Sequence, residues 1–536
     1  MKRENVLTTV GVCLLAACFL VALVRILGRE RAVTHDGKIV IRFAHWQLEG
    51  GLRDAFDQLA RHYEQLHPGV RVEQIAIPER TYPQWIRTQL IGGTAPDIIE
   101  LGLGSDIEIV ARFFTPITEY VRQPNPYNEG TPLAGLPWRE TVIDGMTVAP
   151  SYQSELLENY GAPVSMFTIR MYCNRDLWLL VLGDTPPPAT YDEFLALFPR
   201  IDDYNVRTGS RLLPIAGSKL NAGMLISALL QNQTQRLVQE KIAGPTLRVT
   251  SQEIGLRFLR GEWTLADPGY TDALTIAREV ALHMPPGFSQ LGREEATFYF
   301  VQGKALMITT GSWDSPSFRT QVGFDLDVFD IPLPTREHPR YGKNLLGHSS
   351  EAEIAGGLSF GITRQTPQFD VALDFLRFLT SHPGNTEFAR LSGWLPSVIG
   401  VEPSAEMIPF KPHTDGYVPG FDFNFSYIGA NAQRITDSTT DRLYSPEGSV
   451  DAFRSALASQ LPEGIEADLR RSLRLSELNA NRQDVVLVAL RSLQARTGEE
   501  TGTAAKLDAL VEGQNGMDSA TTWLNTELDQ LAAQSR

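Results

Sequence analysis

Short apolar runs alternate with helix-like stretches in the first part of the chain, and this alternation constrains the fold more than any other feature. Residues 38–46, 70–77 and 97–101 carry the apolar runs typical of strands. Residues 52–66 place apolar side chains at the spacing of one buried helix face, and a second helix is expected around 84–91. Strands joined by helices of this length pair mainly in parallel, so we predict an α/β lobe.

The length and charge of the chain bound its architecture and its partners. At 536 residues it exceeds what one hydrophobic core usually supports, so two or more lobes are expected. The hydrophobic content of 43% and the charged content of 21% are ordinary for a globular protein. The formal net charge of -15, without any long run of Lys and Arg, argues against a nucleic-acid partner.

The N-terminus carries an apolar segment that predicts contact with a membrane. Val6–Val24 is nineteen residues without a charge and follows Met1-Lys2-Arg3. At about 1.5 Å per residue, a helix of this length nearly matches a bilayer core of roughly 30 Å. Leu15-Ala16-Ala17-Cys18 has the pattern of a bacterial lipobox, which would make Cys18 the lipidated first residue. An uncleaved anchor is favoured; a lipoprotein and a cleaved export signal stay open.

No catalytic or metal-binding pattern stands out in the sequence. Cys173 is the one thiol downstream of the apolar segment, so the body of the chain holds no internal disulfide. There is no Cys-x-x-Cys pair and no Cys/His group with zinc spacing. Nucleophile-elbow, zinc-protease and phosphate-loop motifs are absent as well. We therefore expect no enzyme activity, no catalytic residues, no metal and no cofactor.

A series of segments, in order, resembles the extracellular solute-binding proteins of the sugar-binding class that serve ABC importers. The most specific is Gly92-Gly93-Thr94-Ala95-Pro96-Asp97-Ile98, which is similar to the "g.aPDi" motif of that family. The remaining segments are Phe43–Trp46, His67–Val72, Asp144–Pro150, Tyr172–Leu177, Thr190–Phe194, Phe300–Met307, Gly311–Trp313, Gly356–Ile362, 367–381 and Gly393–Ser397. The correspondence covers roughly residues 38–427.

The resemblance implies a two-lobed α/β clamp, like a periplasmic binding protein, in which the chain crosses between lobes more than once. On this basis residues 1–37 form the membrane segment and a linker. Residues 38–150 with 305–355 are expected in the first lobe, and 151–304 with 356–440 in the second. Residues 441–536 form an extra helical C-terminal extension, which either packs on the second lobe or offers a docking surface to another protein.

The function implied by the resemblance is capture of a small solute, a sugar or oligosaccharide, in the cleft between the lobes. Closure around the solute would present it to the subunits of an ABC permease, with the body of the protein outside the cytoplasm. The alternative is a ligand-sensing receptor or adaptor that uses the same clamp without transporting anything.

The stretch after the expected strand 305–308 supplies the leading candidate for ligand contact. Two small residues, Gly311 and Ser312, precede the large ring of Trp313. Aromatic rings stack on the apolar faces of sugars, and small residues let a ligand approach the backbone closely. We predict that Trp313 contacts ligand, the alternative being that it fills the space between the lobes.

Further candidates follow other predicted strand ends, crossings or aromatic loops. Rings would stack on a sugar, while amides and carboxylates would hydrogen-bond its hydroxyls. His45 and Asp97 are expected to be structural, with Asp97 holding a turn. The candidates are Trp46, Gln47, Glu49, Tyr152, Gln153, Trp394, Asn424 and Tyr427.

Overall fold

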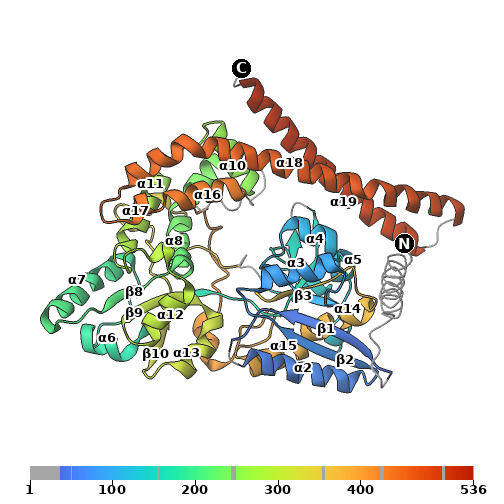
Figure 1. The fold of residues 1–536 in the computed structure, drawn as a ribbon, viewed down its shortest axis with the longest axis horizontal. Helices are drawn as coiled ribbons and strands as arrows, with labels where there is room; N and C mark the ends of the chain where they lie inside the picture. The colour runs from blue at the N-terminus through green and yellow to red at the C-terminus, as the bar shows by residue number, and fades with distance from the viewer. Residues whose placement is uncertain are drawn as a thin grey trace, which may run out of the picture.

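The computed structural model describes residues 37–49, 51–153, 156–242, 249–352, 357–422, 428–497 and 501–534. The apolar segment Val6–Val24, with Cys18, lies outside these residues, as do Asn424 and Tyr427. Within the described ranges, no helix is both long and apolar enough to cross a membrane. Two lobes, each built on its own β-sheet, lie side by side (Figure 1).

The first lobe contains a five-stranded sheet with the strand order β2-β1-β3-β11-β6. Strands β1 (Ile39–His45), β2 (Val70–Ala76) and β3 (Ile98–Glu100) pair in parallel. Strands β11 (Ser359–Ile362) and β6 (Gly161–Pro163) extend the sheet in antiparallel fashion. The predicted alternation of strands and helices at the start of the chain is confirmed.

Helices cover both faces of the first sheet. Successive residues of β1 point to opposite faces, so each contacts a different set of helices. Phe43 packs against α2, α14 and α15, whereas Ala44 faces α3 and α4 on the other side. The helices of this lobe are α2 (Leu52–Leu66), α3 (Tyr82–Gly92), α4 (Ile107–Phe113), α5 (Thr118–Val121), α14 (Phe369–Leu379) and α15 (His382–Ser392). The lobe also contains a short two-stranded hairpin, formed by β4 (Tyr152–Gln153) and β5 (Glu158–Asn159).

The second lobe contains a four-stranded sheet with the strand order β10-β7-β9-β8. Cys173, in β7, one of its two central strands, is fully buried, and burial raises the pKa of the thiol to about 12. The strands are β7 (Ile169–Asn174), β8 (Leu213–Ala216), β9 (Ala305–Gly311) and β10 (Leu326–Phe329). The helices are α6 (Arg175–Leu182), α7 (Tyr191–Thr208), α8 (Lys219–Gln233), α9 (Gln235–Leu237), α10 (Ser251–Leu259), α11 (Pro268–Ala281), α12 (Arg293–Val301) and α13 (Ser315–Gln321).

The strand pairing corrects the expected division into lobes. Residues 305–355 were expected in the first lobe, but β9 pairs with β7 and β8 of the second sheet. Conversely, β6 and β11 were expected in the second lobe and belong to the first sheet. The error has a physical reason: local patterns predict a strand, whereas its sheet is decided by partners that lie 92 or more residues away in the sequence.

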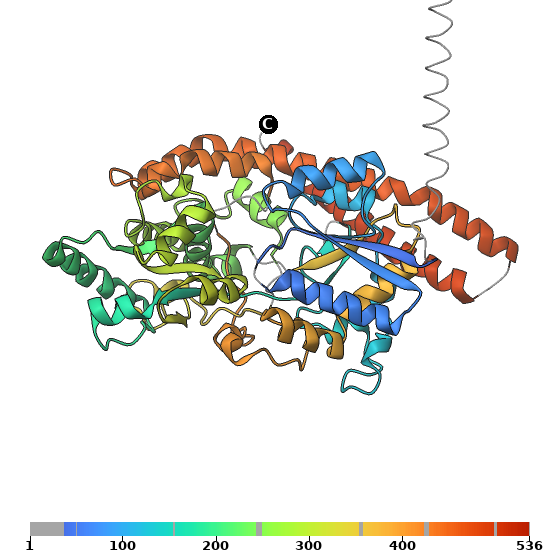
Figure 2. The ribbon, with the colours of Figure 1, turned by 60° about the horizontal axis from the view of Figure 1, so that its bottom comes forward.

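The C-terminal region is helical, as predicted, and its first part belongs to the second lobe. The helices are α16 (Ala430–Thr439), α17 (Asp441–Tyr444), α18 (Val450–Thr497) and α19 (Thr501–Gln534). One face of α18 buries its side chains in the core of the second lobe, at Phe453, Leu457, Leu461, Ile465 and Leu469. Beyond this part, α18 continues past the second lobe and pairs with α19 (Figure 2).

The two residues predicted to be structural have structural roles. Asp97 accepts hydrogen bonds from the backbone N–H of Arg42 at 2.7 Å and from Oγ1 of Thr366 at 2.6 Å. It therefore ties the end of the α3–β3 loop to β1 and to the segment after β11. His45 is fully buried and bonded to Gln74, and burial lowers the pKa of its imidazole to about 4.

Candidate functional site

Two chain segments that cross between the lobes are hydrogen-bonded to each other and form a hinge. Oγ of Ser165 donates to the carbonyl of Leu395 at 2.7 Å, and the N–H of Met166 donates to the same carbonyl at 3.3 Å. The first segment leads from β6 to β7, and the second leaves α15 for the second lobe. The two crossings are therefore fixed to each other at the place where the lobes meet, as the hinge segments of two-lobed proteins are.

A cavity of about 2390 Å³ lies between the two lobes. The first lobe contributes the loop before α3, through Glu79 and Arg80, and Leu103 after β3. The second lobe contributes α8, the start of α12 and Trp313. The carboxyl ends of β3 and β9 both lead into this cavity, which is where open α/β sheets bind ligands.

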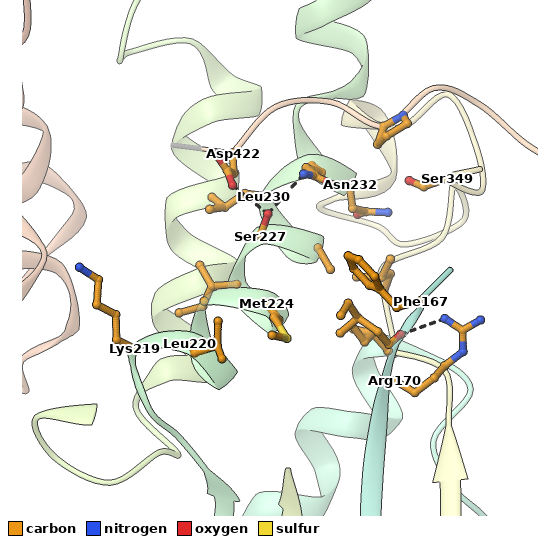
Figure 3. A pocket seen from close by; sticks show the side chains of 18 of the residues that line it. Phe167, Arg170, Lys219, Leu220, Met224, Ser227, Leu230, Asn232, Ser349 and Asp422 are labelled. Atoms are coloured by element: carbon orange, nitrogen blue, oxygen red, sulfur yellow. Dashed lines mark hydrogen bonds between the residues drawn. The ribbon is translucent and has the colours of Figure 1, made fainter. Parts of the chain in front are cut away.

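One face of α8 forms the second-lobe wall of the cavity. Leu220, Met224, Ser227 and Gln231 line it at four- and three-residue spacing, which places them on one side of the helix. Met224 faces Phe167 across the cavity (Figure 3). The wall thus combines apolar side chains with hydrogen-bonding groups.

The hydrogen-bonding part of this wall is held in place by neighbouring side chains. Oγ of Ser227 donates to Asp422 at 2.8 Å, and Nε2 of Gln231 donates to Ser227 at 3.3 Å (Figure 3). Arg170 is buried at another edge of the cavity and makes two hydrogen bonds to Glu351, of 2.7 and 3.0 Å. These hydrogen bonds hold the polar side chains of the cavity wall in place.

Trp313 lines the cavity beside the hinge. Its ring meets that of Phe167 edge to face, with 5.0 Å between the ring centroids. A Cβ atom on Gly311 would lie 2.1 Å from the Trp313 ring, so the glycine is needed to let the ring fold back over the strand end. Ser312 exchanges hydrogen bonds with Thr168 of the crossing segment, at 2.9 and 3.3 Å. The small residues therefore position the ring and the hinge.

Arg293 joins the two lobes across the cavity. Its guanidinium bonds to Asp314 of its own lobe at 2.6 Å, and lies 3.7 Å from Glu49 and 3.5 Å from Glu79 of the first lobe. Burial disfavours its charge, but these three carboxylates outweigh that effect and raise the pKa of Arg293. Burial also raises the pKa of Glu49, which Arg293 opposes. This cluster is an electrostatic contact between the lobes at the cavity.

Two candidates after β1 pack inside the first lobe, outside the wall of the cavity. The centroid of the Trp46 ring lies 4.9 Å from that of Tyr82, and the backbone N–H of Trp46 donates to the Glu100 carboxyl at 3.1 Å. Nε2 of Gln47 donates to the same carboxyl at 2.5 Å. Glu100 is fully buried, and burial raises the pKa of its carboxyl well above the ordinary value. These side chains support the end of the sheet.

The remaining candidates within the described residues do not line the cavity. Gln153 Nε2 donates to the carbonyl of Pro150 at 3.2 Å, and Tyr152 precedes it in β4. Trp394 is 6% exposed and packs in the first-lobe core next to the hinge. Of the sequence candidates that fall within the described residues, only Trp313 lines the cavity.

Sequence reasoning missed Phe167, Arg293 and the α8 face. The start of α8 shows only the signal of a helix cap, and Ser218 does cap the helix by accepting from the N–H of Asn221 at 3.1 Å. The periodic signal at Leu220, Met224 and Ser227 mixes apolar and polar types, so it resembles an ordinary amphipathic helix. Arg293 carries no local signal, because its partners come from distant loops.

Comparison with known proteins identifies the family. Residues 49–386 match the model of the bacterial extracellular solute-binding protein family, which is more than half of the chain. The chain belongs to this family. The resemblance stated from the sequence is thereby confirmed, and the chain is a binding protein rather than an enzyme. No curated protein sequence matches it.

Solved structures share the fold of this solute-binding protein. The GacH receptor of Streptomyces glaucescens is 14% identical, with a TM-score of 0.57 over 80% of this chain and 98% of GacH. The cyclic α-maltosyl-1,6-maltose binding protein of Arthrobacter globiformis is 16% identical, with a TM-score of 0.54 over 80% and 99%. RafE of Streptococcus pneumoniae is 15% identical, with a TM-score of 0.52 over 80% and 98%. They confirm the two-lobed α/β clamp.

Replacing Arg293 tests the electrostatic contact between the lobes. We expect Arg293→Gln to leave Glu49, Glu79 and Asp314 without their shared cation, so that the three carboxylates repel one another and the lobes separate. Small-angle scattering of the solute-free protein should then give a larger radius of gyration than wild type. Arg319→Gln is the matched control, since the Arg319–Glu406 pair lies within the second lobe at 3.9 Å. Equal radii for Arg293→Gln and wild type would contradict the contact.

Glu100 predicts a pH dependence of stability. Burial raises the pKa of this carboxyl, so the folded protein keeps its proton to a higher pH than the unfolded chain, which ionises from about pH 4.5 upward. Wild-type stability is therefore lost as pH rises above that value toward the folded pKa. The side chain at position 100 of the Glu100→Gln variant cannot ionise. The melting temperature of Glu100→Gln minus that of wild type should therefore increase from about pH 4 to pH 7. The exposed Glu447→Gln serves as control; a constant difference for Glu100→Gln would contradict the assignment.

Proposed function

We propose that this solute-binding protein captures a carbohydrate, most simply an oligosaccharide, between its lobes and delivers it to an ABC permease. The observation that carries the proposal is the cavity wall, in which Trp313 and Phe167 lie opposite the mixed face of α8. Rings and Met224 suit the apolar faces of sugar rings, and Ser227 and Asp422 suit their hydroxyls.

The size of the cavity favours an oligosaccharide. At about 2390 Å³ it exceeds the 300–1,000 Å³ or so of ordinary small-molecule pockets. The solved neighbours support the same class, since GacH has been solved with acarbose and RafE with raffinose. Their low identities carry the fold alone, so the solute class is inferred from the wall together with these ligands.

Capture proceeds by closure about the hinge. A solute that touches both walls gains contacts only when the lobes are together, so binding shifts the equilibrium toward the closed form. Arg293 adds attraction between the lobes at the same place, because Glu49 and Glu79 lie on the opposite lobe. The closed form then presents a surface, shared by both lobes, to the permease.

The N-terminal segment completes the proposal by holding the protein at the membrane. Val6–Val24 serves as an uncleaved anchor, or Cys18 carries lipid after cleavage, and the body lies outside the cytoplasm. Either arrangement keeps the clamp close to its permease and raises the effective concentration of one for the other.

A melting screen of the full chain in detergent, against monosaccharides, raffinose, acarbose and other oligosaccharides, tests the solute class. A bound sugar at one hundred times its dissociation constant stabilises by about 2.7 kcal/mol, which raises the melting temperature measurably. Trp313→Ala should then weaken the binding of that sugar at least tenfold, measured by calorimetry below the melting temperature of each variant. The loss reflects removal of the ring that stacks on the sugar.

The control for this experiment is Trp523→Ala, a ring on α19 that is 40% exposed and lies outside the cavity wall. It should bind with wild-type affinity. Unchanged affinity in Trp313→Ala would instead assign the ring to packing between the lobes, and a screen without any shift would contradict the sugar class.

A further inference from the structure

The C-terminal hairpin of α18 and α19 contacts both lobes, independently of the hinge. The first half of α18 is part of the second-lobe core, where Phe453, Leu461 and Ile465 are fully buried. This half of the helix must therefore move with the second lobe. Both overall views show α18 continuing along one edge of the molecule toward the first lobe (Figures 1 and 2).

Two contacts attach the hairpin to the first lobe. Arg471 of α18 forms an ion pair of 3.0 Å with Glu108 at the start of α4. On α19, Gly516 lies under Leu157 of the β4–β5 turn, since a Cβ at Gly516 would be 2.1 Å from the leucine methyl. The glycine thus makes room for the leucine tip against bare helix backbone.

The hairpin returns to the second lobe near its end. Glu527 of α19 pairs with Arg260 after α10, and Leu524 and Leu528 are buried in the second-lobe core. Both helices are therefore fixed to the second lobe while their middle parts touch the first. A rotation that opens the cleft has to pull the first lobe away from these middle parts.

We propose that the α18–α19 hairpin is a strap that limits how far the cleft opens. A helix of 48 residues is about 72 Å long at about 1.5 Å per residue, long enough to reach from one lobe across the other. The ion pair between Arg471 and Glu108 is weak by itself, because exposed ion pairs contribute little. Two contacts at separate places resist rotation without preventing it.

The strap lies outside what the family match explains. That match ends at residue 386, before α16, and the solved neighbours are covered almost completely while a fifth of this chain has no counterpart in them. The inference rests on the proposed opening and closing of the cleft, but it holds for any solute.

Single-molecule fluorescence transfer between the lobes tests the strap in the full chain. Dyes on Ile91→Cys and Val206→Cys, which are 74% and 84% exposed, report the distance between the first and second lobes. Cys13 and Cys18 are replaced by Ser, and Cys173 is buried, with a raised thiol pKa of about 12, and does not react.

Leu157→Asn removes the leucine contact without straining the turn, since residue 157 has a φ of 54°, which Asn tolerates. In the solute-free protein this variant should shift the distance distribution to longer values. Arg470→Ala is the matched control, because Arg470 pairs with Glu466 of the same helix at 2.7 Å. It should leave the distribution unchanged.

A charge exchange supplies the second test. Glu108→Arg places two arginines together and should lengthen the distance, and Glu108→Arg with Arg471→Glu should restore it. Wild-type distributions in both Leu157→Asn and Glu108→Arg would overturn the strap. If a sugar raises the melting temperature of the wild-type protein but leaves the distance between the two dyes unchanged, the proposed closure would be overturned instead.

Discussion

The hydrogen-bonded pair of crossing segments is the constraint on which the rest of the structure depends. Because Ser165 and Met166 share the carbonyl of Leu395, two of the segments that cross between the lobes are fixed to each other where the lobes meet. Ser312 is bonded to Thr168 of the same crossing, so the end of β9 is fixed to the hinge. This places Trp313 at the inner end of the cleft, where both lobes meet.

Charged side chains also act between the two lobes at the cleft. Arg293 draws Glu49 and Glu79 toward the second lobe, which favours closure even before solute binds. The cavity of about 2390 Å³ nevertheless remains, since the pairs occupy one place in it. A solute therefore has to complete the contacts between α8 and the first lobe. In the proposed closure, binding energy and lobe movement would be linked by these contacts.

The local part of the fold could be predicted from the sequence, and the non-local part could not. Spacing of apolar residues located β1, α2 and β2. Trp313 was found because a large ring follows two small residues. The bonds from Trp46 and Gln47 to the buried Glu100 could not be predicted, because a strand end alone does not tell which groups its residues contact.

Small-angle scattering of the full chain, with and without a saturating sugar whose binding has been verified by calorimetry, tests the central claim most directly. Closure about the Ser165–Leu395 hinge predicts a smaller radius of gyration when the sugar is bound, because the two lobes move together over it. The same change should follow for any solute that contacts both walls. Identical scattering profiles in the two states would contradict the account, since the sugar would then bind without bringing the lobes together.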